Sequence, residues 1–171
     1  MRWTSSEIAI LGMTTTVVVA ILSALAAYLA AKRDRRRTLY SEAVQAIAGW
    51  KEMLYRVRRR QTDDAPELVA QFHELQDKLA FCEAWVGSES KYMARSYRRL
   101  VREVKGATES LIQEAWETPP RSPRAADTEF GPVPDLTSSI DRFLADVRSH
   151  LSPMPWRKLA IASRNPETGN S

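Results

Sequence analysis

An uncharged run near the N-terminus constrains this chain more than any other feature of its sequence. The run covers residues 8–31 (IAILGMTTTVVVAILSALAAYLAA), and a strongly basic cluster follows it at once. As an α-helix, a run of this length crosses a hydrocarbon layer of about 30 Å. The sequence therefore predicts a single N-terminal transmembrane helix at residues 8–31, preceded by a short extracytoplasmic N-terminus at residues 1–7.

The charges on the two sides of the run predict its orientation. Arg2 and Glu7 precede it, whereas five basic residues lie in the juxtamembrane segment 32–37. Because Lys and Arg flanks stay in the cytoplasm, we expect the N-terminus outside and residues 32–171 inside, at the cell membrane. These residues either fix the topology alone or also bind anionic lipid head groups; they are Lys32, Arg33, Arg35, Arg36 and Arg37.

A cleaved secretory signal is the alternative interpretation of the same run. Ala24-Leu25-Ala26 resembles a cleavage site. The run is too long for a signal peptide, however, and its positive charge lies on the wrong side. The single cysteine, Cys82, also fits a reducing cytoplasm, where proteins rarely depend on disulfides.

Small residues recur at four-residue spacing within the run, at Gly12, Thr16, Ala20 and Ala24. On a helix these positions share one face, and small side chains there let two membrane helices approach closely. This face predicts either a homo-oligomer or contact with another membrane protein.

The rest of the chain has the composition of one helical domain. Apolar residues recur every three or four positions in long Ala-, Leu-, Glu- and Arg-rich stretches. The pattern predicts helices at about 38–60, 64–87 and 89–117, a Pro-rich linker at 118–135, a fourth helix at 136–151 and a mostly irregular tail at 152–171. The residues expected to cap or end these helices are Asp64, Gly87, Ser88 and either Asp135 or Ser138.

Short turns and alternating charge predict how these helices pack. Two short turns between three long helices require an up-down-up arrangement. Residues 32–60 hold ten basic and three acidic residues, whereas residues 61–90 hold one basic and seven acidic residues, so the first two helices attract each other. We expect an all-α fold in which the transmembrane helix is followed by a cytoplasmic antiparallel, coiled-coil-like bundle of three to four helices. The position of the fourth helix stays open.

Two further segments have alternative interpretations. Residues 154–161 mix apolar and basic side chains, and they either lie on the bilayer surface, pack on the bundle or hang free. A basic stripe on the third helix either contacts an acidic partner or phosphates, or forms an ordinary solvated face. Its members are Lys91, Arg95, Arg98, Arg99, Arg102 and Lys105.

The sequence holds little that points to catalysis. His73 and His150 are the only histidines, and neither belongs to an H-E-x-x-H motif. Cys82 falls on the apolar stripe of the second helix, where a cysteine acts as a small apolar residue. The sequence contains no glycine-rich phosphate loop. We therefore expect no enzymatic activity, no cofactor and no metal site.

These features favour a single-pass membrane protein with a cytoplasmic helical interaction module. It would serve as an adaptor, scaffold or accessory subunit that self-associates and binds another membrane or membrane-proximal protein. One alternative is a small bacterial or phage-type effector that oligomerises in the bilayer and alters permeability or excludes DNA. A membrane-tethered nucleic-acid binder is a weaker third possibility, because groove-reading and RNA-binding motifs are absent from the sequence.

Overall fold

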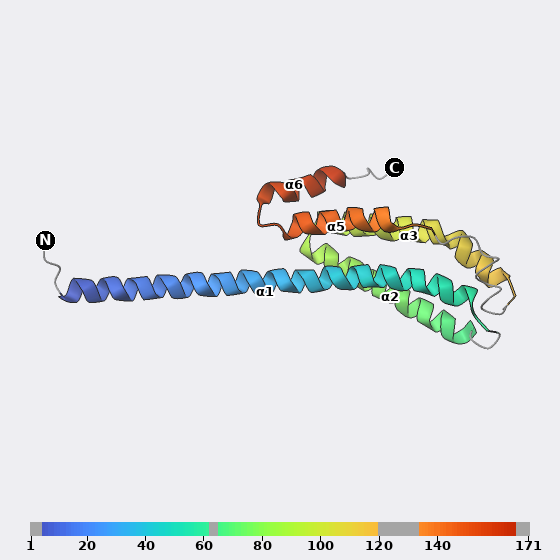
Figure 1. Ribbon diagram of the computed structural model, residues 1–171, viewed down its shortest axis with the longest axis horizontal. Coiled ribbons are helices and arrows are strands. Elements are labelled where there is room, and N and C mark those ends of the chain that lie inside the picture. Colours follow the sequence, from blue (N-terminus) through green and yellow to red (C-terminus); the bar gives the residue numbers. More distant parts are fainter. Residues whose placement is uncertain (1–4, 62–64, 120–133, 167–171) are drawn as a thin grey trace. The chain divides into compact units, whose positions relative to one another are not determined.

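The computed structural model describes residues 5–61, 65–119 and 134–166, with side chains from residue 17 onward except at 155 and 158. All elements in these ranges are α-helices, which confirms the all-α part of the predicted fold class (Figure 1). The helices are α1 (Ser5–Arg58), α2 (Ala65–Glu89), α3 (Lys91–Glu117), α5 (Thr137–Leu151) and α6 (Pro155–Arg164).

The chain divides into two compact units, Met1–Thr38 and Leu39–Ser171. The first unit contains the N-terminal part of α1, where every residue from Val17 to Arg35 is exposed to solvent. In the part of the chain that the structure describes, no helix is both long and apolar enough to cross a membrane. The span expected at residues 8–31 stays a prediction, and its residues 8–16 lie outside the described side chains.

The second unit is an antiparallel bundle. The indole Nε1 of Trp50 donates to the Thr108 hydroxyl at 2.8 Å, and the Tyr97 hydroxyl donates to the Ala43 carbonyl at 3.4 Å. Later residues of α1 thus contact later residues of α3, so these two helices run parallel to each other. The short connections on both sides of α2 make it antiparallel to both of them.

Helix α5 completes the bundle by packing antiparallel to α3. The Ser96 hydroxyl donates to Asp146 at 2.7 Å near one end of the pair, and Arg142 donates to Glu103 at 3.0 Å near the other. The fourth helix, whose position the sequence left open, therefore belongs to the bundle.

Aromatic rings from three helices meet in the core. Tyr40, Tyr97 and Phe143 are at most 2% exposed, and the ring of Phe143 lies 6.3 Å from that of Tyr40 and 5.6 Å from that of Tyr97. Trp50 and Phe72 make a similar edge contact between α1 and α2 at 4.8 Å. Each buried ring contributes about 1.5–3 kcal/mol through removal of apolar surface from water.

Two expected helix ends differ from the structure. Helix α2 continues through Gly87 to Glu89, and no described glycine has a positive φ angle, so Gly87 is not a left-handed cap. The N-cap of α3 is Ser90, whose hydroxyl accepts from the Met93 amide, whereas the Ser88 hydroxyl donates to the Trp85 carbonyl. The expected cap Asp64 lies outside the described residues.

Asp135 acts at the start of α5. Its carboxylate accepts from the Thr137 amide at 2.9 Å, although the N-cap position itself is Leu136. The hydrogen bonds from Thr137 stabilise the charged form and lower the pKa of the Asp135 carboxyl.

The tail expected to be mostly irregular contains a further helix. Residues 155–164 form α6, which begins with Pro155 in its first turn and packs against α5 and α3. The prediction for this segment was therefore wrong, and the contacts that hold α6 explain why.

Candidate functional site

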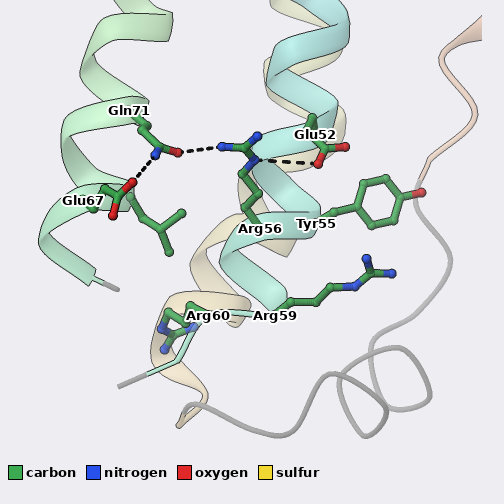
Figure 2. Close-up of a pocket in the computed structure, with 8 residues that line it drawn as sticks. Glu52, Tyr55, Arg56, Arg59, Arg60, Glu67 and Gln71 are labelled. Carbon is green, nitrogen blue, oxygen red and sulfur yellow. Dashed lines mark hydrogen bonds and ion pairs between the residues drawn. The ribbon is translucent and has the colours of Figure 1, made fainter. Parts of the chain in front are cut away.

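A pocket of about 340 Å³ lies where α1 and α2 meet near the connection between them. Figure 2 shows a row of polar groups across it. Arg56 donates to Gln71 at 2.9 Å, Gln71 donates to Glu67 at 2.9 Å, and Arg56 lies 3.7 Å from Glu52. The side chains that line it are Glu52, Tyr55, Arg56, Arg59, Arg60, Glu67, Leu68 and Gln71.

Arg60, at the edge of this pocket, binds the C-terminal end of α3. Its guanidinium donates to the carbonyls of Ala115, Trp116 and Thr118, and it stacks 5.1 Å from the centre of the Trp116 ring. These carbonyls end α3, where the helix leaves its last acceptors without partners and where cations are favoured. We call this set of contacts the Arg60 clip, because it ties the end of α1 to the end of α3.

Most polar side chains of the pocket pair with one another. Arg56 lies against Glu52 and donates to Gln71, Gln71 donates to Glu67, and Arg59 lies over the Tyr55 ring at 5.8 Å. These contacts join α1 to α2 across the pocket. They could not be predicted from the sequence, because arginines that end an amphipathic helix resemble an ordinary solvated end.

A second hollow, of about 640 Å³, runs between α2 and α3 and is lined by small and charged residues. We call it the α2–α3 groove. Its small residues are Ala80, Ala84, Gly87 and Ala94, and its charged residues are Glu83, Lys91, Arg95 and Arg98.

The small residues give the groove a shallow floor that another helix can approach. A Cβ placed on Gly87 would lie 3.7 Å from that of Ala94, an ordinary contact distance, so α2 and α3 pack closely here. Ala80 and Ala84 are exposed one turn apart on α2. An incoming helix would meet small residues at this floor and the charged side chains Glu83, Lys91, Arg95 and Arg98 around it.

An exposed aromatic pair adjoins the groove on α2. Phe81 and Trp85 are 57% and 43% exposed, and their rings meet edge to face at 6.0 Å. Phe81 follows Ala80 in the sequence and Trp85 follows Ala84. The aromatic pair therefore lies on the face of α2 next to the one that lines the groove. Exposed aromatic residues beside a groove are typical of contact surfaces between proteins.

The groove has an excess of positive charge. Arg98 pairs with Glu83 at 2.6 Å, which offsets one cation. Lys91 and Arg95 lie on either side of Tyr92, 5.3 and 5.6 Å from its ring centre. Three cations against one carboxylate favour an acidic occupant.

The structure places the residues of the predicted basic stripe in four different surroundings. Lys91, Arg95 and Arg98 line the groove, and Arg102 is exposed on α3. Lys105 lies 5.2 Å from the Trp50 ring, and Arg99 turns toward α5 and α6. The stripe is thus not one continuous binding surface.

Asp146 forms a buried polar network that sequence reasoning missed. It is fully buried and accepts hydrogen bonds from Ser96 at 2.7 Å, Asn165 at 2.9 Å and Arg164 at 2.8 Å. Arg99 lies 3.9 Å away. The network joins α3, α5 and the end of α6, and it explains why the segment after two prolines is helical.

The predicted membrane features fall in the first unit. The surroundings of Gly12 and of the Thr16 side chain lie outside what the structure describes, whereas Ala20 and Ala24 are exposed. The basic cluster is exposed at Lys32, Arg33, Arg35 and Arg37 and partly exposed at Arg36, and Arg37 lies 3.5 Å from Asp34.

The reactive side chains are dispersed through the described residues. No group of three or more His, Cys, Asp and Glu side chains suited to a metal ion occurs within 17–61, 65–119 and 134–166. Cys82 is 1% exposed, and burial with the nearby Glu42 raises the pKa of its thiol. Burial also raises the pKa of the Tyr97 phenol. His150 is buried beside Tyr40, with 5.9 Å between ring centres, whereas His73 is exposed.

Comparison of the chain with protein-family models, with curated proteins and with solved structures finds no match. The features that bear on function are therefore those of the molecule itself: the groove, the Arg60 clip and the exposed part of α1.

Proposed function

We propose that this chain is a membrane-anchored interaction module, with the N-terminal part of α1 as its anchor and the α2–α3 groove as its docking surface. The observation that carries the anchor is the exposure of residues 17–31 on every side of α1. The large apolar side chains Val17, Ile21, Leu22, Leu25 and Leu29 are each 51–61% exposed. A helix that is apolar all round is stable when its surroundings are apolar on all sides.

A lipid environment matches this surface better than a single protein partner. A protein partner covers one face of a helix, whereas residues 17–31 are uncharged around the whole circumference. The basic cluster that follows suits the cytoplasmic head-group region, where each basic residue gains about 1 kcal/mol near an anionic surface. Tyr28 lies near this end, and tyrosine is favoured at the membrane interface.

For the groove we propose an acidic helix of a membrane-bound protein as the occupant. The small-residue floor suits the close approach of a helix, and the excess of cations suits carboxylates. An anchor confines both partners to the same bilayer and raises their effective concentration, so a modest groove affinity is sufficient. On this proposal the protein is an adaptor or accessory subunit.

The anchor is tested by alkaline extraction of cell membranes that contain the full chain. We expect the wild type to stay in the membrane pellet and the Val18→Arg/Leu25→Arg variant to move to the supernatant. Each arginine near the centre of a span costs about 2.5–3.5 kcal/mol. The control variant Ala107→Arg/Ser110→Arg adds the same charge to exposed positions of α3 and should stay in the pellet. Extraction of the wild type would contradict the anchor.

The groove is tested by in-cell photo-crosslinking from a reactive amino acid at Ala84. We expect a cross-linked partner whose yield falls at least fivefold in the Lys91→Glu variant, which reverses a groove charge. Lys78→Glu makes the same change on α2 outside the groove and should leave the yield unchanged. Equal yields in both variants would contradict the groove. Cross-links to further copies of this chain alone would favour the self-assembling effector instead.

A further inference from the structure

Helix α6 presents an apolar outer face that nothing in the described second unit covers. Met154, Trp156 and Leu159 are 42%, 62% and 72% exposed. On the opposite side, Ile161 and Asn165 are at most 4% exposed and face the bundle. The helix is thus amphipathic, with Trp156 and Leu159 one turn apart on its outer face and Met154 directly before its first residue.

This exposure belongs to a firmly held helix. Arg164 and Asn165 both contact the buried carboxylate of Asp146. From α3, Arg99 donates to the Arg164 carbonyl at 3.0 Å, and Arg95 donates to the Asn165 carbonyl at 3.4 Å. Cations at the carbonyl end of a helix also complement its dipole. The outer face of α6 is therefore presented to solvent by a fixed scaffold.

The charge of α6 indicates what contacts this face. The helix contains Arg157, Lys158 and Arg164 and no acidic residue. Arg164 pairs with Asp146, whereas Arg157 is exposed beside Trp156. Exposed tryptophan and leucine next to basic residues are typical of helices that lie in the head-group layer of an anionic bilayer.

The small size of the face favours a bilayer over a protein. A stable protein interface uses roughly 20–30 residues on each side. The outer face of a ten-residue helix supplies far fewer. In a chain that is already anchored in a membrane, a few such residues are sufficient for binding to its surface, because the anchor keeps α6 at a high effective concentration near the lipid.

We propose that α6 docks onto the surface of a bilayer that contains anionic lipid, with Trp156 and Leu159 in the apolar boundary and Arg157 at the head groups. The proposal rests on the proposed anchor. It adds a second, peripheral membrane contact at α6. This contact would keep the α6 side of the second unit against the bilayer.

The test uses the full chain with Cys82→Ala, so that a single introduced cysteine carries a nitroxide spin label. Leu159→Cys places the label on the outer face of α6, and Ser138→Cys places it at an exposed position of α5 as the matched control. The chains are reconstituted in vesicles of phosphatidylcholine with about one third phosphatidylserine, and in vesicles of phosphatidylcholine alone. Flotation measures vesicle association, and power saturation measures collisions with oxygen and with a water-soluble nickel chelate.

In the anionic vesicles we expect the label at 159 to favour oxygen over nickel at least threefold more than the label at 138. Arg157→Glu should remove most of that difference. A water-like label at 159 on vesicle-bound chains would overturn the α6 proposal and leave the anchor intact. A label shielded from both reagents would also overturn it, in favour of contact with a second copy. An equal preference of the label at 159 for oxygen in the two lipid mixtures would overturn the proposal that α6 requires anionic lipid. Chains that fail to float with vesicles would overturn the anchor and the α6 proposal together.

Discussion

At the scale of single residues, one buried carboxylate connects three helices of this molecule. Asp146 receives hydrogen bonds from α3 and from the end of α6 while it is itself part of α5. Phe143 and Val147, which lie at apolar helical spacing in this segment, face inward. In the sequence, Asp146 resembles a surface residue, because its hydrogen-bond partners are 18 to 50 positions away in the chain. Only the packed helices bring them together.

Replacing this carboxylate should therefore destabilise the bundle. We expect Asp146→Ala to lower the free energy of unfolding by about 2–3 kcal/mol. This is below the usual range for breaking a buried ion pair, because Arg164 is itself 41% exposed and regains water. Asp141→Ala, at an exposed position of the same helix, should change stability by less than about 0.5 kcal/mol. Urea unfolding measures both values, and similar losses in the two variants would contradict the role of Asp146.

Two glycines within helices offer a second test at this scale. A Cβ at Gly106 would meet no atom within 4 Å, whereas a Cβ at Gly49 would lie 3.2 Å from Leu75. Gly106→Ala should stabilise the protein by about 0.5–1 kcal/mol through helix propensity alone. Gly49→Ala should gain less or lose stability, because Leu75 must shift. Thermal unfolding compares them, and an equal gain in both would show that Leu75 yields freely.

At the scale of helices, local pattern predicted the bundle helices but not α6. The four bundle helices carry apolar residues at helical spacing, so their existence could be read from the chain. Segment 152–164 has two prolines near its start and a single deeply buried apolar residue, Ile161. Its helix depends on the Asp146 network and on Arg95 and Arg99, which local pattern does not reveal. The same tertiary contacts explain why Arg99 turns away from the rest of the basic stripe of α3.

The Arg60 clip makes a prediction at the same scale. Arg60→Met keeps the length of the side chain but removes its hydrogen bonds to the last carbonyls of α3. We expect a loss of about 1–3 kcal/mol, because these bonds come from a charged donor and leave buried carbonyls without it. Arg59→Met changes the exposed neighbour and should have little effect. Chemical denaturation provides the comparison, and hydrogen exchange should show faster opening at the C-terminal end of α3 in Arg60→Met alone.

At the scale of the whole molecule, the all-α class followed from composition and spacing, whereas the binding surfaces did not. The groove needs α2 and α3 side by side, and its cations could be predicted only as a stripe on one helix. The core lies entirely within residues 40–161, in the second compact unit. The part of the uncharged run whose side chains the structure describes, residues 17–31, contributes no residue to that core.

Residues 39–171 should therefore fold without the first 38 residues. We expect this fragment to unfold cooperatively, with a midpoint within a few degrees of that of the full chain in mild detergent. Circular dichroism during heating measures both midpoints. A fragment that lacks cooperative unfolding would show that the first unit contributes to the fold of the second.

The position of the single thiol has a consequence for how this protein responds to oxidants. Cys82 is sealed in the core, and the raised pKa of its thiol keeps it in the less reactive protonated form. Oxidative stress should therefore leave this thiol of the folded chain unmodified, with no sulfenic acid and no disulfide bridge between copies. A disulfide-linked dimer on a non-reducing gel would mark molecules that had already unfolded, so the native cysteine serves as a built-in reporter of lost structure.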